Sequence, residues 1–123
     1  MAKILLAEDD ESMLNFLTLA LERAGHTVCA RRDGVEALQI LHEGQTFDLL
    51  LTDIVMPGID GIELAQKAAE IQPEIKIMFV TGFAAMSIKD IGNAKENVPQ
   101  MLSKPFHLND LVDQVERLLS ASA

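Results

Sequence analysis

The chain has 123 residues, of which 49% are hydrophobic and none is Trp or Tyr, and it carries a net charge of −9. This length suits one domain that buries roughly two thirds of the surface its unfolded chain would expose. The negative charge argues against unassisted binding to nucleic acid or to an anionic membrane, because both need basic side chains that neutralise phosphates. We therefore expect neither as a partner, and instead a protein or a metal ion.

Strand-like runs alternate with helix-like runs along the chain, which is typical of repeated βαβ units and a parallel sheet covered on both faces. The pattern predicts strands at residues 3–7, 27–30, 47–53, 76–80 and 100–103. It predicts helices at about residues 10–24, 35–44, 60–71, 84–99 and 108–119. In the second helix, Val35, Leu38 and Leu41 are expected on one side. The helix over 84–99 is interrupted by Gly92 and Asn97, and we expect it to be mobile.

The features that bear on location are a short N-terminal apolar run and a single cysteine. Residues 4–7 are apolar, but Glu8 ends the run, which is too short for the core of a secretory signal. No stretch approaches the roughly twenty apolar residues of a membrane span. Cys29 allows no internal disulfide, and we interpret it as a small buried hydrophobe rather than a redox group. These features predict a cytoplasmic protein.

Polar side chains follow four of the five predicted strands: Glu8, Asp9, Asp53, Thr81 and Lys104. Ligands of open parallel sheets bind outside the carboxyl ends of the strands, so we expect these side chains to meet at one edge of the sheet. For any one of them, a role as a helix cap or a solvated turn residue is an equal alternative. The coincidence of four such placements favours a site.

Carboxylates from Glu8, Asp9 and Asp53 that lay close together would repel one another unless a cation lay between them. Magnesium is the expected cofactor, since it prefers oxygen ligands and usually binds one or two carboxylates and a phosphate oxygen. With the metal and Lys104 drawing charge from the phosphoryl oxygens, the Asp53 carboxylate can attack phosphorus and form an aspartyl phosphate. Thr81 can then donate a hydrogen bond to a phosphoryl oxygen.

Asp10, the third acid of the first cluster, has two interpretations. It caps the first helix, or it belongs to the shell around the metal, and we favour the cap. The histidines, His26, His42 and His107, are too scattered to form a metal site, and we interpret them as surface or cap residues.

Four motifs stand at the predicted sheet edge: the acid pair after the first strand, residues 53–61, Thr81-Gly82 and Lys104-Pro105-Phe106. Jointly they make the chain resemble the receiver domains of two-component response regulators over its whole length. The resemblance implies a doubly wound α/β fold with a five-stranded parallel sheet, five helices and the flavodoxin-like strand order 2-1-3-4-5. It also implies a single receiver domain over residues 1–123, without an output domain.

The same resemblance assigns roles to the acids. It implies that Asp53 is the phosphoacceptor, that Asp9 is a direct magnesium ligand, and that Glu8 acts largely through metal-bound water. It further implies that the backbone carbonyl of Val55 is a ligand of the metal.

Thr81 and Lys104 match the phosphate-sensing pair of the family. Receivers commonly carry Tyr, Phe or His three residues before the lysine, a ring that turns inward when the threonine binds phosphate, and here that position is Met101. We consider Phe83 as a substitute switch residue, and a plain packing role for it is an equal alternative. In this family the peptide bond before the residue that matches Pro105 is usually cis.

Residues 50–54, 79–85 and 102–108 look like the corresponding segments of a group of single-domain cell-cycle regulators from alphaproteobacteria. That likeness implies a histidine phosphotransferase or histidine kinase as phosphodonor. It also implies an unphosphorylated form that helps the protease ClpXP, through its unfoldase ClpX, to recognise substrates. Members of the group tend to end in two alanines that can be read as a degradation tag, whereas this chain has Ser122-Ala123. We expect a monomer or a weak dimer.

Three alternatives stay open. A phosphorelay intermediate and a chemotaxis-type regulator that binds a motor component would share the site and differ in partner. A magnesium-dependent phosphohydrolase would also use an aspartyl nucleophile, but usually has a second acid two residues later, where this chain has Val55. We therefore expect a phosphoacceptor rather than a turnover enzyme.

Overall fold

Five parallel strands form one sheet in the computed structural model, which describes residues 2–81, 100–103 and 108–120. The strands are β1 (Lys3–Ala7), β2 (Thr27–Arg31), β3 (Leu49–Asp53), β4 (Lys76–Thr81) and β5 (Gln100–Ser103). Their order in the sheet is β2-β1-β3-β4-β5, which confirms the predicted order. Since β3 lies in the middle of the sheet, it has a neighbouring strand on each side.

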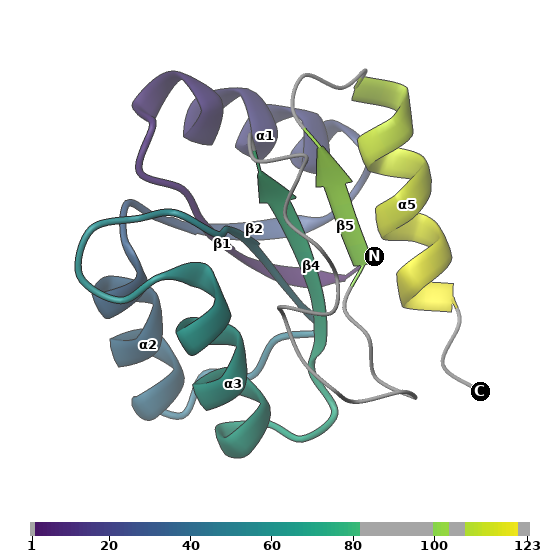
Figure 1. Cartoon of the computed structure of the whole chain (residues 1–123). Helices are drawn as coiled ribbons and strands as arrows, with labels where there is room; N and C mark the ends of the chain where they lie inside the picture. Colours follow the sequence, from purple (N-terminus) through teal and green to yellow (C-terminus); the bar gives the residue numbers. More distant parts are fainter. Residues whose placement is uncertain (1, 82–99, 104–107, 121–123) are drawn as a thin grey trace.

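Four helices cover the sheet within the described residues: α1 (Glu11–Arg23), α2 (Gly34–His42), α3 (Gly61–Ile71) and α5 (Leu108–Ser120). Figure 1 shows α2 and α3 together on one side of the sheet and α1 and α5 on the other. The parallel sheet is therefore covered on both faces, as predicted. The helix predicted over 84–99 lies outside the described residues.

The first three helices each begin after an aspartate that caps the helix N-terminus. The side chains of Asp10, Asp33 and Asp60 accept hydrogen bonds from the backbone N–H groups three residues further on, at 2.8 to 3.1 Å. Each cap satisfies a backbone donor that the helix itself leaves without an acceptor. This confirms the cap at Asp10 and a helix start at Asp60, while the cap at Asp33 was not predicted.

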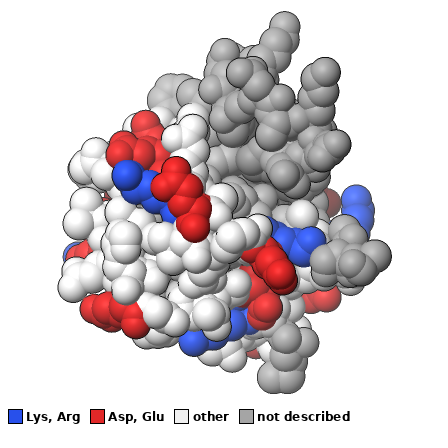
Figure 2. Space-filling view, turned by 90° about the horizontal axis from the view of Figure 1, so that it is seen from below, with Lys and Arg blue, Asp and Glu red and all other residues white. Residues whose placement is uncertain are grey.

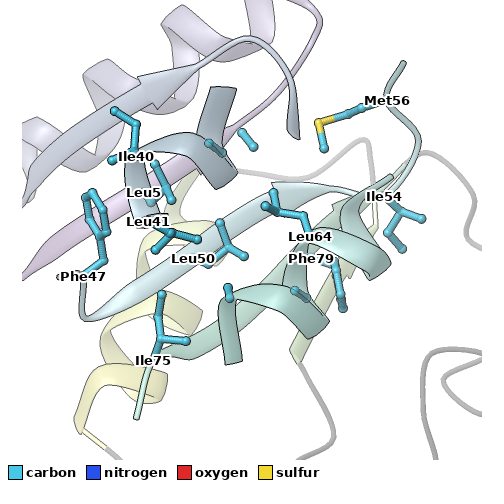
Figure 3. Packing of buried hydrophobic residues seen from close by; sticks show 14 residues of the cluster. Leu5, Ile40, Leu41, Phe47, Leu50, Ile54, Met56, Leu64, Ile75 and Phe79 are labelled. Carbon is cyan, nitrogen blue, oxygen red and sulfur yellow. The ribbon is translucent and has the colours of Figure 1, made fainter. Parts of the chain in front are cut away.

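Two apolar layers fill the space between the sheet and its helices. All five residues of β3 are buried, as expected for a central strand buried on both faces. Leu5 and Leu50 belong to the layer beneath α2 and α3, and Leu6 and Leu51 belong to the layer beneath α1 and α5. Figure 3 shows Leu5 and Leu50 beside Leu41 of α2 in the first layer. Alternation along each strand thus supplies both layers.

Of the three apolar residues expected on one side of α2, Leu41 is buried whereas Val35 is 54% exposed. The residues of α2 that are buried are Gly34, Ala37, Ile40 and Leu41. Gly34 lies so close to the loop before α3 that a Cβ atom at this position would be 2.6 Å from Ile59 Cγ1. Val35, the next residue, lies at the edge of this contact, since a Cβ atom on Gly58 of the same loop would be 3.3 Å from Val35 Cγ2.

His26 is buried, which corrects its interpretation as a surface or cap residue. Its Nε2 lies 2.8 Å from Glu116 Oε2 on α5, and its Nδ1 accepts the backbone N–H of Ala2 at 3.2 Å. The imidazole therefore joins the turn before β2 to the start of the chain and to α5.

The charged side chains are mixed on the face shown in Figure 2, where acidic and basic groups lie next to one another at several places. The net charge of −9 is thus not gathered into one acidic area on the described part of that face.

Within residues 2–81, 100–103 and 108–120, no helix has the length and apolar character needed to span a membrane.

Leu50→Ala tests the contribution of the buried central strand. We expect the free energy of unfolding to fall by about 2 to 5 kcal/mol, because the truncated side chain leaves a cavity in a close-packed layer. The control is Leu19→Ala, since Leu19 is 52% exposed, and its effect should stay within about 0.5 kcal/mol. Urea titration followed by circular dichroism measures both, and equal effects would contradict the layer assignment.

Candidate functional site

The ends of β1 and β3 lie at the same level of the sheet. Their register pairs Ala7 with Thr52, so that Glu8 and Asp53 are the next residues on adjacent strands. Side chains two residues apart in a strand point to the same face. Glu8 and Asp53 therefore lie on the same face as Leu6 and Leu51, which is the face covered by α1 and α5. The two acids therefore emerge side by side at one edge.

Three carboxylates gather at this edge: those of Glu8, Asp9 and Asp53. One ligand atom from each lies within 4.8 Å of the others. Glu8 is fully buried, Asp53 is 8% exposed, and Asp9 is exposed. The cluster thus has two acids set into the protein and a third at its opening. This is the convergence of acids that the sequence predicted.

Hydrogen bonds that involve backbone N–H groups position Glu8 and Asp53. The Glu8 N–H donates to the carbonyl of Arg31 at 3.1 Å, which extends the pairing of β1 with β2 by one residue. The Asp10 N–H donates to Glu8 Oε2 at 3.1 Å, and the Val55 N–H lies 3.4 Å from Asp53 Oδ1. Each acid side chain of the buried pair therefore accepts from the loop that follows its own strand.

The donor set fits a hard divalent cation. All three side chains offer carboxylate oxygens, and oxygen ligands are those that magnesium prefers. Burying carboxylates is costly unless a positive charge or hydrogen-bond donors compensate, and a cation at this edge would supply such a charge. Val55, two residues after Asp53, lies in the adjoining loop with its side chain 50% exposed.

The strands β4 and β5 end at the same edge. Asp53 pairs with Val80, and the next residue, Thr81, pairs with Ser103 at the end of β5. The backbone of Thr81 is therefore close to the level of Asp53. Lys104 and Phe83 lie outside the described residues, and Met101 lies within β5.

Asp10 belongs to the helix rather than to the acidic cluster. Its Oδ1 accepts the Met13 N–H at 3.1 Å, and it is not among the three acids whose ligand atoms lie together. Of the two interpretations that the sequence left open, the structure supports the cap.

Gly61 has a role that the sequence did not reveal. A Cβ atom built on it would overlap the carbonyl oxygen of Asp53, and its N–H donates to the Ile54 carbonyl at 2.7 Å. The start of α3 can therefore approach the end of β3 only if this residue has no side chain. A glycine is a poor residue for the first turn of a helix, and that mismatch is the signal that could have found it.

Comparison with known proteins agrees with this geometry. A family model described as the response regulator receiver domain matches residues 4–116. The chain is 52% identical over 122 residues to the response regulator receiver protein CpdR of Brucella abortus, covering 99% of this chain and 100% of that protein. Other relatives are longer, and this chain spans 12% to 53% of their length. The family match and the identity to CpdR over the whole chain confirm the resemblance that the sequence predicted.

Solved structures give the same result. A response regulator receiver protein from Sinorhizobium medicae aligns with a TM-score of 0.87 and 33% identity, covering 97% of this chain and 94% of that one. The response regulator protein TrrA from Thermotoga maritima, in complex with Mg2+-BeF, aligns with a TM-score of 0.83 and 26% identity, covering 96% and 99%.

Two substitutions at Asp10 test its assignment as a cap. Asp10→Ala should lower the free energy of unfolding by about 1 kcal/mol, because the Met13 N–H loses its acceptor. Asp10→Ser should keep most of the stability, since a serine hydroxyl also accepts this bond. Urea titration measures both. If the serine variant lost as much as the alanine variant, the charge of Asp10 rather than its cap would be what stabilises the protein.

Proposed function

This chain belongs to the response regulator receiver domain family, and from that membership we propose that Asp53 accepts a phosphoryl group in a magnesium-dependent reaction. Members of the family are phosphoacceptor regulators rather than turnover enzymes. The observation that carries the proposal is the cluster of Glu8, Asp9 and Asp53, whose ligand atoms lie within 4.8 Å of one another. Asp53 is the acceptor because it ends the central strand and can face both the metal and the incoming phosphorus.

The reaction is a transfer between two nucleophiles. One carboxylate oxygen of Asp53 forms a bond to phosphorus while the phosphorus–nitrogen bond of a phosphohistidine donor breaks, and the imidazole leaves with the electron pair. Magnesium, when bound, draws charge from the phosphoryl oxygens. Asp9 and Asp53 would hold the metal directly, together with the backbone carbonyl of Val55, and Glu8 would act largely through metal-bound water.

Thr81 and Lys104 complete the proposed mechanism. After transfer, the Thr81 hydroxyl donates a hydrogen bond to a phosphoryl oxygen, and the Lys104 ammonium pairs with the negative charge. The register that sets Thr81 one residue beyond the partner of Asp53 supports this role. Phe83 and Met101 are the candidates for a side chain that changes position in response.

Acetyl phosphate tests the acceptor and the metal together. With magnesium present, intact-mass spectrometry should find one added phosphoryl group that is lost in mild alkali, because an acyl phosphate is labile. Asp53→Asn should gain none, and neither should the wild type after removal of magnesium with EDTA.

The matched control for that experiment is Asp33→Asn. Asp33 caps α2 outside the cluster, and an asparagine keeps the cap, so this variant should be phosphorylated like the wild type. Stable phosphorylation of Asp53→Asn would contradict the acceptor, and full reaction in EDTA would contradict the metal. Sustained hydrolysis of small phosphate esters would instead support a phosphohydrolase.

We also propose a cellular role for this protein. It acts as a single-domain, cytoplasmic adaptor that assists proteolysis by ClpXP in cell-cycle control, and phosphorylation of Asp53 controls that role. The 52% identity to CpdR over the whole chain supports this proposal. The phosphodonor is then a histidine phosphotransferase or a histidine kinase. Phosphorylation replaces the single negative charge of the Asp53 carboxylate with about two on the phosphoryl group at neutral pH. This change can shift the equilibrium between two conformations of a binding surface if one of them binds the phosphoryl group better.

Pull-down of ClpX tests the adaptor role. Wild type and Asp53→Ala should both recover ClpX without phosphodonor, and acetyl phosphate with magnesium should weaken recovery by the wild type alone. Recovery in neither state would exclude the adaptor and favour a phosphorelay intermediate or a chemotaxis-type regulator. That result would leave phosphorylation of Asp53 untouched.

A further inference from the structure

Thr52 is a buried polar residue that the proposed reaction does not yet use. It precedes Asp53 in β3 and is fully buried. The alternation of side chains places it on the α2 and α3 side of the sheet, opposite to Asp53. Its register partners, Ala7 and Phe79, are both fully buried and belong to the apolar layer of that side. A hydroxyl in such surroundings is costly unless it makes a hydrogen bond.

The hydrogen bond that Thr52 makes is to the residue that accepts the phosphoryl group. Its hydroxyl donates to the backbone carbonyl of Asp53 at 2.8 Å, and its oxygen lies 3.9 Å from the sulfur of Met56. A hydroxyl has one hydrogen to donate, and a carbonyl oxygen is a far better acceptor than a thioether. The bond to Asp53 is therefore the one that satisfies Thr52.

Gly61 approaches the same peptide group. The carbonyl oxygen of Asp53 lies where a Cβ atom of Gly61 would be, and Ile54 Cα would lie 2.9 Å from that atom. The Gly61 N–H also donates to the carbonyl of Ile54, which closes the loop between β3 and α3. The peptide group after Asp53 thus accepts a hydrogen bond from the Thr52 hydroxyl and lies closely against the backbone at the start of α3.

The orientation of this peptide group determines where the Asp53 side chain lies. The two share the Asp53 Cα atom, so a rotation of the carbonyl changes the backbone torsion at Asp53 and can move the carboxylate. Attack on phosphorus depends steeply on the placement of the reacting atoms. We propose that Thr52 is a positioning residue, whose hydroxyl fixes the Asp53 backbone so that the carboxylate is aimed for attack. This inference rests on the proposed function of Asp53.

Thr52→Val removes the hydroxyl while keeping the shape of the side chain. With acetyl phosphate and magnesium, we expect it to be phosphorylated roughly fivefold or more slowly than the wild type, because the carboxylate is less well placed. Thr52→Ser keeps the hydroxyl and should recover most of the rate. Thr18→Val is the matched control, since the Thr18 hydroxyl likewise donates to a backbone carbonyl, that of Leu14, at 2.7 Å within α1.

The readouts separate positioning from a merely structural role. Phosphorylation rates come from intact mass against time, and urea midpoints show how far each variant is destabilised. The backbone amide shift of Ile54 in NMR spectra should change in Thr52→Val and not in Thr18→Val. If Thr52→Val does not fold, Thr52→Cys replaces it, because a thiol occupies similar space and donates only weakly.

Each outcome decides between the two proposals. A Thr52→Val variant that reacts as fast as the wild type, or a loss of rate that Thr52→Ser does not recover, would overturn the positioning role alone. A wild type that takes up no phosphoryl group would overturn the proposed function and this inference with it.

Discussion

The parallel pairing of β1 with β3 is the constraint on which the acidic site depends. Residues 4–7 are fully buried and β3 is buried along its whole length, so apolar burial on both faces keeps the two strands together. Their register then brings Glu8 and Asp53 out at the same level of the sheet. Mutual repulsion opposes such a cluster, and the free energy of burying the strands is far larger than that repulsion.

The connections of the fold add to this arrangement. In a parallel sheet each strand leads into a helix, so α1 and α3 both start at the edge where β1 and β3 end. A helix N-terminus carries partial positive charge, which favours negative groups nearby. Asp10 and Asp60 use some of this charge as caps. The same topology therefore places the carboxylates near helix N-termini, whose partial positive charge is favourable for negative groups.

Much of the fold could be predicted because strand-like and helix-like runs alternate along the chain, and four of the five predicted strands lead into polar residues. The acidic cluster followed from the same pattern, since strands that run parallel end at a common edge. The close approach of Gly34 to Ile59 could not be predicted, because the local pattern of α2 does not show which of its residues meets the loop before α3. The burial of His26 depends on Glu116, 90 residues away, and no local pattern contains that contact. The hydrogen bond from Thr52 to the Asp53 carbonyl joins adjacent residues, but the sequence pattern does not distinguish Thr52 from the other residues of its strand.

The uniform burial of β3 has a further consequence. A strand that reads Leu49-Leu50-Leu51 offers leucine to both layers, so a shift of one position along β1 would exchange one leucine for another. The hydrophobic interior barely distinguishes the two alignments, whereas the polar residues at the strand end do, because a shift would carry Asp53 to the opposite face. The carboxylate of Asp53 thus favours one alignment of the central strand over the other. Replacing Asp53 with leucine would remove this difference between the two alignments of the central strand.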